Sequence, residues 1–257
     1  MTVTERATTH IDPLHGTDGH RSTATDRSMV RLIDVFRIYR EADVETVALR
    51  GVDLRIEPGE FVAIMGRSGS GKTTLLNLIA GSDRPSAGQV MVDGVDMARG
   101  DEESRVDVRG RRIGLVFQDQ NLLPLLSLRE NLALCGHLAG RSIDDADVRR
   151  RLGRVGLEER ADHRPDELSG GEQQRAALAC ALVADPPILL GDEVTGELDS
   201  ATAATVLDLI AEIHAAGTTV VLVTHDPAVA ARAKRIVELH DGHVVADRIA
   251  ASPAVTA

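Results

Sequence analysis

The sequence of 257 residues predicts an α/β fold in which helices cover both sides of a mainly parallel sheet. Short, unbroken apolar runs are typical of strands that are buried on both faces, and the chain has several of them. Segments with the helical spacing of apolar residues lie between these runs, and this alternation favours a parallel sheet. The apolar runs lie at 61–65, 113–117, 188–190 and 219–223.

The first part of the body predicts strands at 30–38 and 47–56. A turn at 57–60 separates them from the first apolar run, because its proline fixes φ and its glycine permits the chain to reverse. A glycine-rich loop and an apolar helix come after that run, and we expect the helix to end near Gly81. Asp93-Gly94 predicts a hairpin between two short strands.

The second part predicts a separate helical lobe at about 121–165, where Gly and Arg interrupt the leucines. A helix at 169–184 comes after it. The body closes with a short strand pair around Asp241-Gly242. Another predicted helix, at 201–215, has one apolar face formed by Val206, Leu209, Ile210 and Ile213.

The two ends of the sequence differ from this body. Residues 1–28 are rich in Thr, Asp, His and Gly, so we expect a disordered tail. We expect 249–257 to be a flexible C-terminal tail, which leaves 29–248 as one folded domain. The first residues show no secretory signal, and the aliphatic runs are far shorter than the ~20 residues that span a bilayer. The chain is therefore not expected to cross a membrane by itself.

Composition and charge restrict the classes of partner. The formal net charge of −11 argues against nucleic acid as the main ligand, because phosphate backbones are bound by a surplus of Lys and Arg. Hydrophobic residues make up 43% and aromatic residues only 2%, so the core must consist mainly of Ala, Val, Leu and Ile. Cys135 and Cys180 match no metal-binding spacing, and we interpret them as reduced thiols of a cytosolic protein.

The segment from Gly66 to Thr73 matches the P-loop pattern between a predicted strand and a predicted helix. Its glycines let backbone N–H groups turn toward phosphate oxygens, and the helix N-terminus adds a partial positive charge. Lys72 adds a full charge, and the Thr73 hydroxyl suits Mg²⁺. The P-loop alone does not distinguish a kinase, a GTPase and a transport ATPase. The predicted nucleotide-binding residues here are Gly66, Arg67, Ser68, Gly69, Ser70, Gly71, Lys72, Thr73 and Thr74.

Two carboxylates, Asp192 and Glu193, come directly after the apolar run at 188–190 and Gly191. At the carboxyl end of a strand they are expected to point into the crevice where the P-loop opens. Asp192 suits a role in holding Mg²⁺. Glu193 suits polarising the water that attacks the γ-phosphate, so we predict that it is catalytic, together with Lys72.

The segment from Leu168 to Arg175, LSGGEQQR, resembles the signature of the ABC ATPase family. Ser169 is expected to cap a helix. The two glycines that follow it leave the N-terminal N–H groups of this helix open to an anion. The resemblance implies a homodimer in which each ATP lies between one P-loop and the partner's signature. It also implies a RecA-like core with an N-terminal antiparallel β subdomain and an inserted helical subdomain. The implied contacts to ATP across the interface are Ser169, Gly170, Gly171 and Glu172.

Other positions match the same family over about 30–248. Gln118 resembles the Q-loop glutamine that senses Mg²⁺ and the γ-phosphate, and His225 resembles the catalytic switch histidine. The D-loop resemblance at 196–199 implies that Asp199 lies at the dimer interface. Tyr39 lies where an aromatic ring stacks on adenine in relatives, although it could instead be a core tyrosine.

Four residues depart from the usual family pattern. Arg67 and Val194 stand where Pro is usual, and Gly191 stands where Ala is usual. Glu197 places an acid near the expected dimer interface. None of these changes removes a chemical group that the expected chemistry needs.

The resemblance is nearest to the branch that serves macrolide-export and lipoprotein-release permeases. It implies an ATP-hydrolysing subunit on the cytoplasmic face of the cell membrane that drives a separate integral-membrane permease. A leucine-rich segment, 122–126, is a candidate for permease contact, although a core role for at least two of its leucines is equally compatible with the pattern. The alternatives are a non-transport ABC ATPase and a nucleotide switch that hardly turns over. The cargo and the direction of transport do not follow from the sequence.

Overall fold

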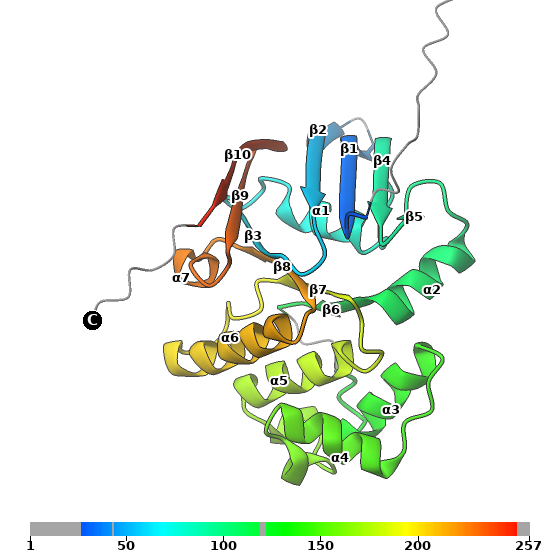
Figure 1. Cartoon of the computed structure of the whole chain (residues 1–257), viewed down its shortest axis with the longest axis vertical. Helices are drawn as coiled ribbons and strands as arrows, with labels where there is room; N and C mark the ends of the chain where they lie inside the picture. Colours follow the sequence, from blue (N-terminus) through cyan, green and yellow to red (C-terminus); the bar gives the residue numbers. More distant parts are fainter. Residues whose placement is uncertain (1–26, 43, 119–121, 251–257) are drawn as a thin grey trace, which may run out of the picture.

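The computed structural model describes residues 27–42, 44–118 and 122–250, and it contains two β-sheets with a separate group of helices (Figure 1). A four-stranded sheet has the order β2-β1-β4-β5, and a six-stranded sheet has the order β10-β9-β3-β8-β7-β6. The smaller sheet comprises β1 (Val30–Glu41), β2 (Val44–Ile56), β4 (Ala87–Val92) and β5 (Val95–Asp96). The larger comprises β3 (Phe61–Met65), β6 (Ile113–Val116), β7 (Ile188–Asp192), β8 (Thr219–Thr224), β9 (Arg235–His240) and β10 (His243–Ile249).

The smaller sheet is antiparallel throughout. Strand β1 pairs with β2 on one side and with β4 on the other. The predicted hairpin at Asp93-Gly94 joins β4 to β5, and both of its residues have positive φ, at 45° and 79°. This conformation suits Asp and Gly in a tight two-residue turn. The sheet forms the N-terminal antiparallel subdomain that the resemblance implied.

The larger sheet is parallel from β9 to β6, and only β10 is antiparallel. Met65 at the end of β3 pairs in register with Thr224 at the end of β8. Asp192 at the end of β7 pairs with Val223. The loops after these three strands therefore leave one edge of the sheet side by side, which is where ligands bind in open α/β sheets.

Helices cover both faces of the larger sheet (Figure 1). Helix α1 (Lys72–Ile79) lies between the two sheets, and its leucines belong to a core that both sheets share. Helix α6 (Ser200–Ala215) packs on the opposite face. Three of the residues predicted for its apolar face, Val206, Ile210 and Ile213, are buried, whereas Leu209 is half-buried against the helical lobe.

The helical lobe has its own apolar core. It contains α3 (Leu128–Leu138), α4 (Asp145–Arg154) and two short 3₁₀ turns, Glu158–Arg160 and Pro165–Glu167. Helix α5 (Gly170–Ala181) then leads back to β7. This helix is shorter at both ends than the predicted 169–184, because Ser169 is its N-cap and Leu182 its C-cap.

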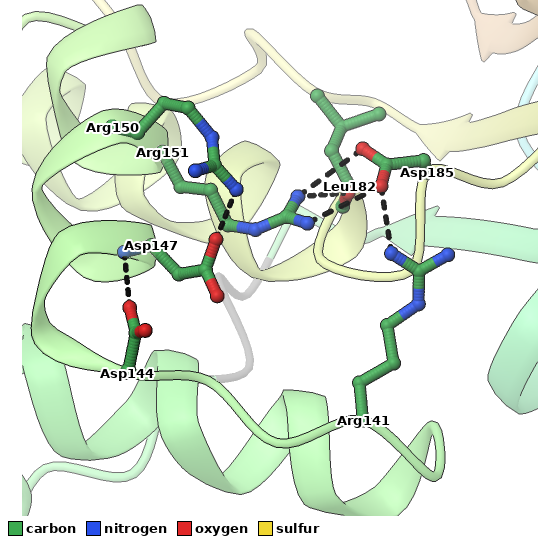
Figure 2. Close-up of polar contacts among 7 residues, drawn as sticks. All are labelled: Arg141, Asp144, Asp147, Arg150, Arg151, Leu182 and Asp185. Atoms are coloured by element: carbon green, nitrogen blue, oxygen red, sulfur yellow. Dashed lines mark hydrogen bonds and ion pairs between the residues drawn. The ribbon is translucent and has the colours of Figure 1, made fainter.

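Two guanidinium groups attach the helical lobe to the turn that joins α5 to β7 (Figure 2). Arg151 on α4 donates to both carboxylate oxygens of Asp185, each at 3.2 Å, and to the carbonyl oxygen of Leu182 at 3.0 Å. Arg141 donates to Asp185 at 2.7 Å. Partial burial opposes ionisation of Asp185, but the hydrogen bonds and charges of Arg151 and Arg141 hold its pKa below the usual value. We call Arg141, Arg151 and Asp185 the Asp185 clamp.

Two helices were not predicted. Helix α2 (Glu102–Arg112) has a polar sequence, and Val108 is its only buried apolar residue, so the apolar spacing gave no signal. Its start is instead fixed by Asp101, whose side chain accepts from the backbone N–H of Ser104 at 2.7 Å. Helix α7 (Pro227–Ala230) is a single turn capped by Asp226. Neither helix disturbs the predicted sheet.

The folded body extends slightly beyond 29–248. Ser28 is buried, next to Met29, whose backbone N–H donates to the carbonyl oxygen of Ile56 at 2.8 Å. Strand β10 includes Ile249. The remaining parts of the predicted tails, 1–26 and 251–257, lie outside the described residues. In the described part of the chain, no helix combines the length and the apolar composition that a bilayer crossing requires.

Candidate functional site

A cavity of about 720 Å³ opens at the edge of the sheet where β3, β7 and β8 end. It gathers residues that are far apart in the sequence, from the P-loop, from the Asp192-Glu193 pair and from the loop after β8. All of the predicted catalytic and metal-binding residues therefore line one cavity. The lining residues are Thr46, Val47, Ala48, Arg67, Ser68, Gly69, Gly71, Lys72, Thr73, Thr74, Gln118, Asp192, Glu193 and His225.

The P-loop wraps the start of α1. Gly71 precedes the helix with a φ of 102°, a conformation that a residue with a Cβ rarely adopts. A Cβ at Gly66 would lie 2.4 Å from the carbonyl oxygen of Leu239, so this position also requires glycine. Lys72 folds back over the loop and donates to the carbonyl oxygen of Arg67 at 3.0 Å. The loop, the helix N-terminus and this ammonium group together favour an anion.

Asp192 is 8% exposed, and its Oδ1 atom is buried with no hydrogen-bond partner among the described residues. Burial raises the pKa of this carboxyl above its usual value, although a hydrogen bond from Thr73 and the charge of Lys72 oppose the rise. A buried carboxylate oxygen without a partner is costly unless a cation or donor reaches it. Thr73 and Gln118 line the same cavity and carry oxygen atoms, which Mg²⁺ prefers as ligands. The three residues predicted to hold Mg²⁺ therefore fit that ion chemically.

Glu193 and His225 are in direct contact. The Nδ1 atom of His225 lies 2.8 Å from Oε1 of Glu193, and the Thr224 hydroxyl donates to Oε2 at 3.3 Å. Glu193 has a φ of 49°, which is uncommon for a residue with a side chain. Its side chain is 18% exposed, whereas that of His225 is 69% exposed. The Glu193 side chain is therefore the more enclosed of the two, and the His225 imidazole contacts it from the open side of the cavity.

Glu197 of the expected D-loop contacts a residue that lines the cavity. Gln118 donates to the Glu197 carboxylate at 3.3 Å, so this unusual acid contacts the predicted metal-sensing glutamine. Asp199 caps α6, because its Oδ1 accepts from the backbone N–H groups of Ala201 and Thr202, at 3.0 and 3.1 Å. Hydrogen bonds from Thr202 hold the pKa of Asp199 below its usual value. The position at the dimer interface stays a prediction, and the capping role was not anticipated.

The signature segment lies apart from this cavity. Among the described residues that line the cavity, none comes from 169–172. Ser169 and Glu172 form a reciprocal capping box at the start of α5, with the Ser169 hydroxyl donating to Glu172 at 2.8 Å. Arg160 lies 3.3 Å from the other Glu172 oxygen. Hydrogen bonds from Ser169 lead the contributions that hold the pKa of Glu172 low, so this carboxylate is already engaged locally.

Gly171 brings the start of α5 against α6. A Cβ at this position would lie 2.0 Å from the Cγ2 methyl of Thr202, a distance that side chains do not adopt. The second signature glycine thus has a packing reason as well as the predicted role toward an anion. The sequence by itself indicates only the role toward an anion.

Tyr39 is not among the residues that line the cavity. Its hydroxyl donates to Asp83 at 2.9 Å and lies 3.4 Å from the Thr74 hydroxyl. The guanidinium carbon of Arg37 lies 4.2 Å above the centre of its ring. One face of the ring is therefore covered, and stacking on adenine stays a prediction for the other. Thr46, Val47 and Ala48 do line the cavity, but nothing in their sequence distinguishes them from other strand residues.

Comparison with known proteins agrees with this arrangement. A family model described as ABC transporter matches residues 49–196. The chain belongs to the ABC transporter family.

The curated relatives of this ABC protein include longer proteins named macrolide export ATP-binding/permease protein MacB. The MacB of Rhodopseudomonas palustris (strain BisB18) is 46% identical over 235 residues, which are 90% of this chain and 36% of the relative. The MacB of Hyphomonas neptunium (strain ATCC 15444) is 44% identical over 221 residues, which are 85% of this chain and 34% of the relative. The chain thus spans about a third of the length of these relatives. They confirm the predicted likeness to the macrolide-export branch.

Solved ABC cassettes share the fold. The dimeric structure of MJ0796, a bacterial ABC transporter cassette, matches with a TM-score of 0.81 and 40% identity over 87% of this chain and 99% of that one. A dimeric post-hydrolysis state of MJ0796 bound to ADP and Pi gives the same values. The predicted fold class is confirmed, and so is the enzyme class, an ABC ATPase. The roles of the individual site residues remain proposals.

Proposed function

We propose that this ABC ATPase binds Mg-ATP in the cavity at the end of β3, β7 and β8 and hydrolyses it to power transport through a separate permease. The observation that carries the proposal is the convergence of a phosphate-binding loop, a buried carboxylate and a Glu–His pair on one cavity. Each group suits one part of phosphoryl transfer to water.

The P-loop backbone and Lys72 would hold the β- and γ-phosphates, with Tyr39 against the adenine. Thr73, Gln118 and Asp192 would hold Mg²⁺, which supplies charge neutralisation on the phosphate oxygens when bound. Glu193 would accept a hydrogen bond from the attacking water. His225 already contacts Glu193, so it can hold this carboxylate in position and reach the γ-phosphate from the open side.

We further propose that two copies of the chain close around two ATP molecules. The N-terminus of α5, at Ser169, does not line the nucleotide cavity of the same chain. It is nevertheless a second helix N-terminus that suits an anion. A head-to-tail homodimer would place it over the partner's P-loop, with Asp199 near the interface. The dimeric state of the MJ0796 cassette, at 40% identity, supports this arrangement.

The partner that we propose is an integral-membrane permease of an exporter or lipoprotein-release type, with the ATPase on the cytoplasmic face of the membrane. The MacB relatives support it, since their name joins an ATP-binding part to a permease and this chain spans about a third of them. Leu123 and Leu125 are 47% and 79% exposed and could contact such a partner, whereas Leu122 packs on the core of the helical lobe. The net charge of −11 gives no reason to propose a nucleic-acid partner.

The proposal is tested by replacing Glu193 with Gln. We expect ATP turnover to fall by about 10²–10⁴, the usual contribution of a positioned general base, while Mg-ATP affinity stays within about twofold. Glu212→Gln, on the exposed side of α6, is the matched control and should keep full turnover. Turnover that survives in Glu193→Gln would contradict the assignment of Glu193. A wild-type chain that binds ATP but barely hydrolyses it would favour the nucleotide switch instead.

A further inference from the structure

A second cavity, of about 670 Å³, is lined by residues of β1, of the segment that follows α1 and of α2. Among the described residues, none lines both this cavity and the nucleotide cavity. The two sites are therefore distinct, and no part of the proposed ATP chemistry uses the second one. Its lining consists of Arg37, Gly81, Ser82, Asp83, Arg84, Pro85, Glu102, Arg105 and Arg109.

The cavity holds a surplus of positive charge on a protein whose net charge is −11. Among the described residues that line it, four are arginines and two are acids. Arg37 is paired with Asp83 at 2.8 Å. In the part of the chain that the structure describes, the three other arginines share a single carboxylate, that of Glu102.

The sharing leaves these three guanidinium groups short of acceptors. Glu102 contacts Arg105 directly, lies 3.2 Å from Arg109 and is only loosely approached by Arg84, at 3.7 Å. Arg109 also donates to the carbonyl oxygen of Gly81 at 2.6 Å. One unit of negative charge therefore faces three units of positive charge.

Arg105 shows the imbalance most clearly. It is 4% exposed, and its Nε atom is buried without a hydrogen-bond partner in the described part of the chain. Burial lowers the pKa of Arg105, and the charges of Arg84 and Arg109 lower it further. A buried guanidinium that its neighbours repel is costly unless an anion offsets it.

We propose that Arg84, Arg105 and Arg109 form a binding site for a small oxyanion of the phosphate class. Planar guanidinium groups bind phosphate oxygens through paired, charge-assisted hydrogen bonds, and Arg is preferred over Lys where such pairing matters. A dianion would restore charge balance in the cavity, where one carboxylate does not. Free phosphate and the phosphate of a lipid headgroup carry the same group.

The site also touches the nucleotide-binding region indirectly. Arg37 covers the ring of Tyr39, and Asp83 accepts hydrogen bonds from both residues. An oxyanion that draws Arg37 away from Asp83 would free one face of Tyr39. Occupancy of the second cavity can therefore influence the residue that we expect beside adenine.

The test is calorimetric titration of inorganic phosphate into the full chain at constant ionic strength. The protein is first saturated with Mg²⁺ and the non-hydrolysable ATP analogue AMP-PNP, so that the P-loop is filled. We expect one equivalent of phosphate to bind, and Arg105→Met to weaken it by at least about tenfold, since a charge-assisted contact is lost. Arg150→Met, which alters an exposed arginine of α4, is the matched control and should bind like wild type.

Arg84→Gln is a second variant that keeps the test decisive if Arg105→Met does not fold. The Arg84 side chain is 58% exposed, so its loss should leave the unfolding temperature unchanged while phosphate affinity falls. Equal affinity in wild type, Arg84→Gln and Arg105→Met would overturn the proposal, and so would the lack of saturable binding to wild type. Flotation with phosphatidylcholine vesicles, with and without phosphatidic acid, identifies the source: binding that requires both phosphatidic acid and Arg105 assigns a lipid headgroup, and phosphate binding without flotation assigns a soluble anion.

Discussion

The imidazole Nδ1 of His225 lies 2.8 Å from the Oε1 atom of Glu193. The two residues come directly after adjacent strands, β8 and β7, so the register of the parallel sheet brings them together. The glutamate is also held by Thr224 and is largely buried, whereas the histidine is mainly exposed. The contact therefore restricts the orientation of the carboxylate that we propose as the base.

This contact predicts the effect of His225→Ala. We expect ATP turnover to fall by about 10²–10⁴, because the base loses its positioning partner and the γ-phosphate loses a donor. Affinity for Mg-ATP should change little, since the P-loop and Asp192 are untouched. His137→Asn, on the exposed surface of α3, is the control and should retain turnover. A His225→Ala protein with wild-type kcat would refute the role.

The same site shows which of its residues could be predicted from the sequence and which could not. The P-loop, Asp192 and Glu193 could be placed because each comes after a short apolar run that is typical of a buried strand. Thr46 to Ala48 could not be placed, because they line the cavity from β2, a strand of the other sheet, and carry no chemical signature. Helix α2 was missed because a buried arginine, Arg105, takes an inward-facing position where the apolar spacing expects a hydrophobic residue.

The Asp185 clamp predicts a stability effect. Arg151→Met should lower the free energy of unfolding by about 1–2 kcal/mol, because hydrogen bonds to a charged group are lost while the exposed partner limits the loss. Urea denaturation measures this value. Arg150→Met, the neighbouring exposed arginine shown in Figure 2, should change it by less than about 0.5 kcal/mol. Equal effects of the two substitutions would show that the clamp contributes nothing specific.

The clamp also predicts a dependence on pH. The pKa of Asp185 is lowered in the folded protein, so its contribution is complete above the unfolded value of about 3.9 and is lost as pH falls through the folded value. The difference in unfolding free energy between wild type and Arg151→Met should therefore be constant near neutral pH and shrink below about pH 4. Urea titrations across this range provide the measurement. A difference that grows on acidification would contradict the assignment.

Close packing of Gly171 on Thr202 predicts a rescue experiment. Gly171→Ala should destabilise the fold by about 1–3 kcal/mol, because its Cβ would collide with the Thr202 methyl. Thr202→Ser removes that methyl and keeps the hydroxyl that donates to Asp199 at 2.6 Å. The double variant should regain most of the lost stability in thermal unfolding. Failure to regain it would mean that the two helices meet elsewhere.

The proposed dimer predicts a cross-link between different sites of two molecules. Ser68 and Ser169 are exposed, and each can be replaced by Cys after Cys135 and Cys180 are replaced by Ser. In a mixture of the two single-Cys proteins, both carrying Glu193→Gln, a bifunctional thiol cross-linker long enough to span the bound nucleotide should join them with Mg-ATP, and not without nucleotide. An equal yield of cross-linked heterodimer with and without nucleotide would contradict ATP-driven closure. Cysteine at exposed Arg150 serves as the control for random collision.

Helix α1 is enclosed by a core to which both sheets contribute, with Leu75, Leu76, Leu78 and Ile79 all fully buried. The phosphate loop leads directly into this helix, so its conformation depends on a core that both sheets complete. A nucleotide bound to this loop should consequently stabilise both sheets together against unfolding, because the loop keeps its shape only while both are in place.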